Sequence, residues 1–323
     1  MIATVTLNPS LDEWVEVPTL RTGVLHRARS FARYPGGKGI NVSRVIHELG
    51  GRSVAYAFTG GGDGQMLRHA LARLGITGVF VSVHGATRNN YKILTTRPRA
   101  LTEINTPGPR VRAGDVRRLG RALLGRGRRL ACATLCGSLP PGASAGVYAQ
   151  WIRMLRARRV PVVLDTSGAA LRLGVAARPF LIKPNRQEAE ELLGRRLPGR
   201  AALIEAARAL VARGVEVVIL SLGAEGALLA CARERAVWWA RPPRVRVNSG
   251  VGAGDSLVAG FLVGWLGASR APAEGAARRA WLLQAFRLGV ACGTATVITP
   301  GTELCHRKDV RRLLPRVHIT QLV

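Results

Sequence analysis

Acidic residues and lysines are both scarce in this sequence of 323 residues. Asp and Glu number 19 against 48 Lys and Arg, and only four of the basic residues are lysines, namely Lys38, Lys92, Lys183 and Lys308. The arginines are spread over predicted helix faces instead of forming one stripe, so the net charge of +29 favours a compositional bias over a nucleic-acid-binding surface. A nucleic-acid partner is therefore not expected. Where arginine is the default, a lysine indicates a site that needs a compact ammonium group.

The sequence also lacks the marks of secreted and membrane proteins. Its longest apolar run, residues 256–268, is shorter than the about 20 residues that a membrane-spanning helix needs. The first residues contain neither a basic segment nor a cleavage site, so we expect no secretory leader and no membrane partner. The five cysteines are scattered without a CxxC pair, which argues against a disulfide framework or a zinc site and favours a cytoplasmic location.

Short apolar runs alternate with helical periodicity along most of the chain. Strands are predicted at residues 2–7, 53–58, 129–135, 160–165, 180–183 and 217–220. Helices are predicted at residues 41–49, 64–74, 145–158, 188–193, 201–213, 255–266 and 276–296. This alternation is typical of an α/β fold with a mainly parallel sheet and helices on both faces. Two later runs, 227–231 and 237–240, are spaced like an antiparallel hairpin.

Two segments, residues 13–32 and 90–105, interrupt this alternation. Each contains short alternating stretches with no helix between them. We expect the two segments to pair as a small β-sheet lid inserted into a single domain spanning residues 1–323, rather than to form a second core.

Two glycine-rich segments stand where predicted helices begin. In Val251-Gly252-Ala253-Gly254-Asp255-Ser256, backbone N–H groups and the helix N-terminus can hold an anion, and Asp255 beside that anion can accept a proton. In Pro35-Gly36-Gly37-Lys38-Gly39-Ile40-Asn41, Lys38 offers a charge for a phosphate and Asn41 can bind hydroxyls. Each segment also suits an ordinary capped loop. Neither matches the dinucleotide-binding fingerprint or the P-loop.

Together, GGKGIN and VGAGDS resemble the PfkB (ribokinase-like) family of sugar kinases. Seven further motifs stand in the family's order, at residues 6–12, 87–88, 102–105, 137–142, 164–168, 183–188 and 221–227. They are most similar to the branch that phosphorylates hexose phosphates. The resemblance implies a ribokinase-like three-layer α/β/α fold with a small β-sheet lid, and ATP-dependent transfer of a phosphoryl group to a sugar hydroxyl.

The resemblance also implies a role for each matching residue. Asp255 would be the general base on the acceptor hydroxyl, and the amides of Gly252, Ala253 and Gly254 would form the anion hole for the transferring group. The residues expected to hold the sugar are Asp12, Gly36, Gly37 and Asn41, with Ser138 lining the same site. The residues expected to hold the phosphate already on the sugar are Lys38, Arg88, Arg27 and Lys92, of which the last two would also suit a solvated lid.

At the nucleotide end, the resemblance assigns Lys183, Asn185 and Glu188 to the ATP phosphates and to Mg²⁺, with the metal held by Asn185 and Glu188 through water. Ser221, Gly223 and Gly226 would contact the ATP phosphates or ribose. The Asn-x-x-Glu spacing also matches a helix capping box. Two further residues are expected to be structural. Asp165 would shape the end of a strand, and Cys136 would fill a buried space.

The expected reaction converts fructose 1-phosphate to fructose 1,6-bisphosphate. Tagatose 6-phosphate and fructose 6-phosphate are the near alternatives, and an unphosphorylated substrate such as ribose or adenosine is the more distant one. Lids of related enzymes often mediate dimer contacts, so a homodimer through the lid is expected. The alternative from another class is an inactive kinase-like protein that binds nucleic acid through its basic surface.

Overall fold

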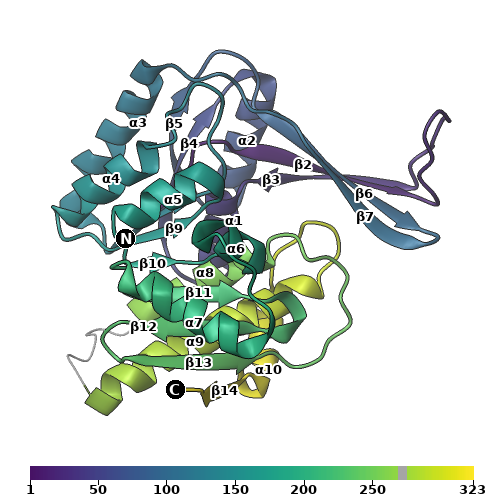
Figure 1. The fold of residues 1–323 in the computed structure, drawn as a ribbon. Helices are drawn as coiled ribbons and strands as arrows, with labels where there is room; N and C mark the ends of the chain where they lie inside the picture. Colours follow the sequence, from purple (N-terminus) through teal and green to yellow (C-terminus); the bar gives the residue numbers. More distant parts are fainter. Residues whose placement is uncertain (268–274) are drawn as a thin grey trace.

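A ten-stranded sheet forms the centre of the structure (Figure 1). The computed structural model describes residues 1–267 and 275–323, so the last residue of the apolar run 256–268 lies outside the described residues. Strands β5 to β11 of the sheet order are parallel, and β12, β13 and β14 continue it antiparallel. In spatial order the strands are β5 (Thr77–Ser82), β4 (Ser53–Thr59), β1 (Ile2–Thr6), β8 (Cys132–Cys136), β9 (Val162–Asp165), β10 (Leu181–Ile182), β11 (Val217–Ser221), β12 (Ala227–Cys231), β13 (Ala236–Arg241) and β14 (His318–Gln321).

Helices cover both faces of this sheet, which confirms the predicted three-layer α/β/α fold. One face carries α3 (Ala113–Gly125), α4 (Val147–Arg156), α5 (Gly168–Ala176), α6 (Arg186–Leu193) and α7 (Gly199–Ala212). The other face carries α1 (Lys38–Glu48), α2 (Gly61–Arg73), α8 (Ala253–Leu266), α9 (Gly275–Val297) and α10 (Arg307–Leu313). No helix among the described residues is long and apolar enough to cross a membrane.

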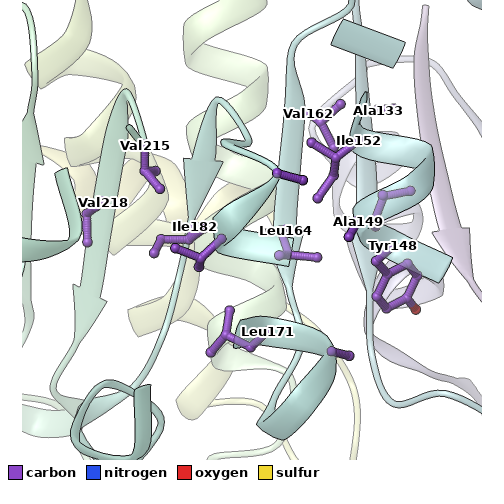
Figure 2. Packing of buried hydrophobic residues seen from close by; sticks show 14 of the residues in the cluster. Ala133, Tyr148, Ala149, Ile152, Val162, Leu164, Leu171, Ile182, Val215 and Val218 are labelled. Carbon is purple, nitrogen blue, oxygen red and sulfur yellow. The ribbon is translucent and has the colours of Figure 1, made fainter. Parts of the chain in front are cut away.

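The alternation of side chains along each strand builds the two apolar layers. In β9, Val162 and Leu164 belong to one buried cluster and Val163 to the other. Figure 2 shows the first of these clusters, where Ile152 of α4 and Leu171 of α5 pack with the β9 side chains. Ile152 is fully buried, so its truncation to alanine would cost about 2–5 kcal/mol of stability.

A second, four-stranded sheet in the order β3-β2-β6-β7 forms the lid. Its strands are β2 (Ser10–Val17), β3 (Ser30–Gly36), β6 (Arg88–Thr96) and β7 (Arg99–Asn105). Both predicted lid segments lie in this sheet, but β2 and β6 begin earlier and β3 ends later than predicted. The reason is the register, since Ser10 pairs with both Gly36 and Arg88 at the edge of the central sheet. The lid strands therefore carry side chains directly into the space beside that edge.

The sequence pattern did not predict four elements, β5, α5, α10 and β14, and it indicated α3 only as a helix face that carries Arg117, Arg118 and Arg121. The two strands lie at opposite edges of the sheet, where most side chains are partly or fully exposed and no apolar alternation appears. The two helices have nine and seven residues, which is too short for a clear helical period. The predicted antiparallel hairpin of β12 and β13 is confirmed. The carboxyl ends of the parallel strands meet at one edge, where ligands of such sheets bind.

Candidate active site

A cavity of about 600 Å³ lies between this edge of the central sheet and the lid. Twelve of the predicted site residues line it, although they come from distant parts of the sequence. They are Asp12, Gly37, Lys38, Asn41, Arg88, Lys92, Ser138, Lys183, Glu188, Gly252, Gly254 and Asp255. Local motifs that were predicted separately therefore converge on one space.

Seven predicted residues do not line the cavity. Gly36 and Ala253 are chain neighbours of lining residues, and Asn185 contacts Glu188. Ser221 ends β11 and forms a β-bridge with Asn185, and Gly223 and Gly226 lie between β11 and β12. Arg27 lies in the exposed loop that joins β2 to β3. Its predicted contact with a sugar phosphate has no support from the position of this loop.

The glycine-rich segment 250–255 forms the N-terminus of α8. Gly252 is the N-cap and has a φ of 78°, a left-handed conformation that favours glycine. The first amides of α8 have no acceptor within the helix, so they add to the partial positive charge of its N-terminus. A Cβ at Gly254 would lie 3.1 Å from Lys183 Nζ, which places that ammonium directly beside the turn. The arrangement suits a multiply charged anion.

Asp255 stands in the first turn of α8 and is 7% exposed. Its Oδ2 accepts a hydrogen bond of 2.8 Å from Asn41 Nδ2. Burial raises the pKa of Asp255 to about 6, and Asp165 adds to this effect, while Lys38, Asn41 and Lys183 oppose it. The carboxyl group is therefore mostly ionised at neutral pH and close enough in pKa to take up a proton from an alcohol undergoing reaction.

The predicted sugar ligand Asn41 has both ends of its amide engaged by protein groups. Nδ2 donates to Asp255, and Oδ1 accepts a 3.2 Å hydrogen bond from Arg44 Nη1. These contacts fix the orientation of the Asp255 carboxylate relative to α1.

Two of the four lysines meet at one carboxylate. Asp165 Oδ1 lies 2.8 Å from Lys38 Nζ and 3.6 Å from Lys183 Nζ. Burial alone would raise the pKa of Asp165, but the two ammonium groups outweigh burial and lower it. Burial alone would lower the pKa of Lys38, but attraction to Asp165, Asp255 and Glu188 raises it. The charge on each of Asp165 and Lys38 therefore favours the ionised form of the other.

Asp12 occupies the lid side of the cavity. Its Oδ1 accepts hydrogen bonds from Ser10 Oγ at 2.9 Å and from Asn90 Nδ2 at 3.3 Å. A Cβ at Gly36 would lie 2.5 Å from the same carboxylate oxygen, so only glycine lets the chain pass this close. Asp12 is 5% exposed and lines the cavity, so its carboxylate can accept a hydrogen bond from a hydroxyl group of a ligand bound there.

The next rung of the lid carries an ion pair. Lys92 Nζ donates to Glu103 and, at 3.2 Å, to Asn105 Oδ1. Lys92 is 4% exposed, so its predicted phosphate contact would require it to give up or share Glu103.

Arg88 differs from the three lysines in the cavity. Its Nη1 donates to Thr106 O at 3.1 Å and its Nη2 to Asn8 O at 3.0 Å. Within the described residues, it is the cation of the cavity lining that has no carboxylate within 4 Å, and its buried Nε–H has no partner there. A second hollow, of about 580 Å³, adjoins the cavity at Asn8, Arg88 and Asn105. The positive charge of Arg88 is therefore not offset by a paired carboxylate and can meet an anionic ligand.

Asn185 and Glu188 form the capping box that their spacing permits. Glu188 N donates to Asn185 Oδ1 at 2.8 Å, and Asn185 N donates to Glu188 Oε2 at 2.9 Å. Ser221 joins them through a β-bridge to Asn185. Glu188 also lines the cavity, so the box presents one carboxylate there.

The donor set fits magnesium held mainly by water. Mg²⁺ usually keeps several waters and binds one or two carboxylates together with substrate phosphates. Glu188 supplies one such carboxylate, and its Oε1 is not used by the capping box. No group of three or more His, Cys, Asp or Glu residues that could enclose a metal occurs in the part of the chain that the structure describes.

Several residues of the site were not predicted. Asn8, Asn90 and Asn105 line the cavity, and Asp165 lies between two lysines instead of only ending a strand. Asn8 and Asn105 stand inside motifs that the sequence analysis singled out, but Asn90 is revealed only by its register opposite Asp12. Cys136, in contrast, is fully buried, and burial raises the pKa of its thiol, which fits the predicted structural filler.

The comparison with known proteins agrees with this geometry. The profile of the pfkB family carbohydrate kinases matches residues 6–309. The chain is 37% identical to a 1-phosphofructokinase from Bacillus subtilis over the full length of both chains. It is 35% identical to an ATP-dependent 6-phosphofructokinase isozyme 2 from Mycobacterium tuberculosis, over 96% of this chain and 88% of the relative.

Solved structures show the same fold. Phosphofructokinase-2 from Escherichia coli, in complex with substrates and products, has a TM-score of 0.88 at 30% identity and covers 98% of both chains. The same enzyme has been solved in a tetrameric inhibited form, with a TM-score of 0.86.

Proposed function

The chain belongs to the pfkB family of carbohydrate kinases and is an ATP-dependent sugar kinase, and from that premise we propose that it phosphorylates fructose 1-phosphate at its free primary hydroxyl on carbon 6. The observation that carries this proposal is the distribution of charge in the cavity. Asp255 and the N-terminus of α8 line it from the central domain. Arg88, the cation without a carboxylate partner, lines it from the start of β6 in the lid, where it donates to Asn8 O, and Asn8 Nδ2 in turn donates to Ser138 Oγ. A sugar phosphate would span the two.

In the proposed reaction, Asp255 accepts the proton of the sugar hydroxyl as its oxygen forms a bond to the γ-phosphorus of ATP. The bond from that phosphorus to the bridging oxygen breaks, and ADP leaves with the electron pair. The amides of Gly252, Ala253 and Gly254 would stabilise the charge on the transferring group, as would the ammonium groups of Lys38 and Lys183. Lys38 is assigned to this group, and no longer to the sugar's own phosphate, because it lies beside Asp165.

The remaining lining residues would hold the sugar. Asp12 would accept hydrogen bonds from its hydroxyls, Gly36 and Gly37 would let the backbone approach it, and Arg88 would bind its phosphate, with Lys92 able to join if Glu103 moves. Closure of the lid over the sugar would exclude water and limit ATP hydrolysis.

At the other end, we place the nucleotide beside Lys183. Asn185 and Glu188 would serve its phosphates and a largely hydrated Mg²⁺, which when bound neutralises phosphate charge. Ser221, Gly223 and Gly226 would lie along the phosphates or ribose, because they follow the strand next to Lys183.

The second candidate substrate is fructose 6-phosphate, which the 6-phosphofructokinase relatives favour. An ADP-release assay with ATP and Mg²⁺ separates the candidates by kcat/KM for fructose 1-phosphate, fructose 6-phosphate, tagatose 6-phosphate, fructose, ribose and adenosine. Highest activity on fructose 1-phosphate supports the proposal. A preference for another sugar phosphate overturns the substrate, and activity confined to an unphosphorylated compound overturns the role of Arg88.

The proposed assembly is a homodimer through the lid. Phe31, Tyr91 and Ile104 are exposed large apolar side chains of three different lid strands, and they lie on the face opposite to Asp12 and Lys92. Covering this face would remove apolar surface from water. The proposed location is the cytoplasm, which the five buried and unpaired cysteines favour.

A further inference from the structure

Asp165 is a buried charge that the reaction described above does not use. It ends β9, is 1% exposed, and places one oxygen, Oδ1, against two ammonium groups. Its other oxygen, Oδ2, is buried with no hydrogen-bond partner in the described parts of the chain. Burying a carboxylate is costly unless it is paired, so a residue needed only to end a strand would be neutral.

The two lysines reach Asp165 from separate elements. Lys38 is the first residue of α1, while Lys183 follows β10, and both line the cavity together with Asp255. Because both ammonium groups lie within 4 Å of one oxygen atom, they are also close to each other and repel. The carboxylate between them is the group that offsets this repulsion and keeps the two charges together.

We propose that Asp165 is a positioning residue for phosphoryl transfer, which holds Lys38 and Lys183 side by side at the transferring group. This role rests on the kinase activity proposed above and adds a residue to it. Asp165 need not touch either substrate. It acts through the two lysines, whose positions decide how well they meet the charge that develops on the transferring group.

The same arrangement sets the environment of the proposed base. The charged groups that act on Asp255 are Asp165 from β9, Lys38 and Arg44 from α1, and Lys183 after β10. Asp165 repels the Asp255 carboxylate and raises its pKa, while the lysines lower it. Loss of the Asp165 charge therefore lowers the pKa of Asp255, and the acid limb of the pH profile moves to lower pH.

The test is Asp165→Asn, which keeps the shape of the side chain and removes its charge. The matched control is Asp115→Asn, which removes an aspartate paired with Arg118 at the N-terminus of α3. We expect kcat to fall about 10²-fold in Asp165→Asn, as displaced catalytic groups cause, and the acid limb of kcat/KM to move below that of the wild type. The control should retain the kcat and the acid limb of the wild type.

Three results separate the possible failures. Wild-type kcat and an unmoved acid limb in folded Asp165→Asn overturn the positioning role. A loss of kcat that excess Mg²⁺ restores, with the acid limb unmoved, also overturns it, because the carboxylate then serves the metal. A wild-type protein inactive on every sugar of the panel instead overturns the proposed function.

If Asp165→Asn does not fold, Asp165→Glu is the second variant. It keeps the charge and moves the oxygen atoms, so kcat should fall while the acid limb stays near that of the wild type. A wild-type kcat in Asp165→Glu overturns the positioning role.

Discussion

The substitution Asp255→Asn should make the folded protein more stable at neutral pH. Burial raises the pKa of this carboxyl group from 3.8 to about 6, so the folded state disfavours its ionised form. A shift of about two pKa units corresponds to about 3 kcal/mol. Asparagine carries no charge and can still accept the hydrogen bond from Asn41. The variant therefore avoids the free-energy cost of holding an ionised carboxylate at this buried position, which the wild type bears because Asp255 is its proposed base.

The pH dependence follows from the sign of the shift. Between pH 3.8 and about 6 the folded state binds more protons than the unfolded state, so the contribution of Asp255 to stability falls as pH rises through this range. The full cost remains at pH 7 and disappears below pH 3.8. Asp255→Asn should thus gain up to about 3 kcal/mol over the wild type at pH 7, and the gain should shrink as the pH falls toward 4.

Urea denaturation of both proteins between pH 4 and pH 7.5 measures this difference, and a rise in Tm of roughly 5 °C at pH 7 would accompany it. The matched control is Asp309→Asn, because Asp309 is also in the first turn of a helix but pairs with exposed Arg312. It should change stability by less than about 0.5 kcal/mol. In the ADP-release assay, Asp255→Asn should lose about 10²–10⁴ in kcat. Equal or lower stability than wild type at pH 7, or a gain independent of pH, refutes the reasoning.

The central elements of the fold could be predicted because the local sequence pattern shows which of their residues are buried. The runs that became β8, β9 and β11 are apolar on both faces, as strands between two helical layers must be. Edge strands such as β5 lack this signal, because solvent replaces one layer of neighbours. The extent of the lid strands depended on pairing between segments far apart in sequence, which no local pattern contains.

The residues of the candidate site also fall into two groups, those that a local motif indicates and those that only the tertiary structure brings together. Glycine-rich turns before α1 and α8 are local signals, so both were predicted to precede helices, as they do. The partners that those residues find are not local: Asn90 faces Asp12 through strand register, and Asp165 meets Lys38 across 127 positions. The scarcity of lysine was the exception, a global property that pointed to local sites. Three of the four lysines line the cavity, where compact ammonium groups share space that planar guanidinium groups would crowd.

Four further outcomes test individual contacts. Arg88→Ala should raise KM for the sugar phosphate about 10- to 100-fold, the value of one charge-assisted contact, and leave KM for fructose unchanged; an unchanged KM for the sugar phosphate would move the phosphate site elsewhere. Tyr91→Lys on the outer lid face should shift the mass measured by light scattering toward the monomer, unless the lid is not the interface. Gly36→Ala should lower kcat/KM for the sugar about 10²-fold with KM for ATP retained, because the added Cβ would lie 2.5 Å from the Asp12 carboxylate. Lys38→Arg keeps the charge, but a planar guanidinium cannot share Asp165 Oδ1 with Lys183 in the same geometry, so kcat should fall about 10²-fold although the net charge of the site is unchanged. Full activity in that variant would show that charge alone is sufficient at this position, and that the shared carboxylate oxygen does not decide which cation the site accepts.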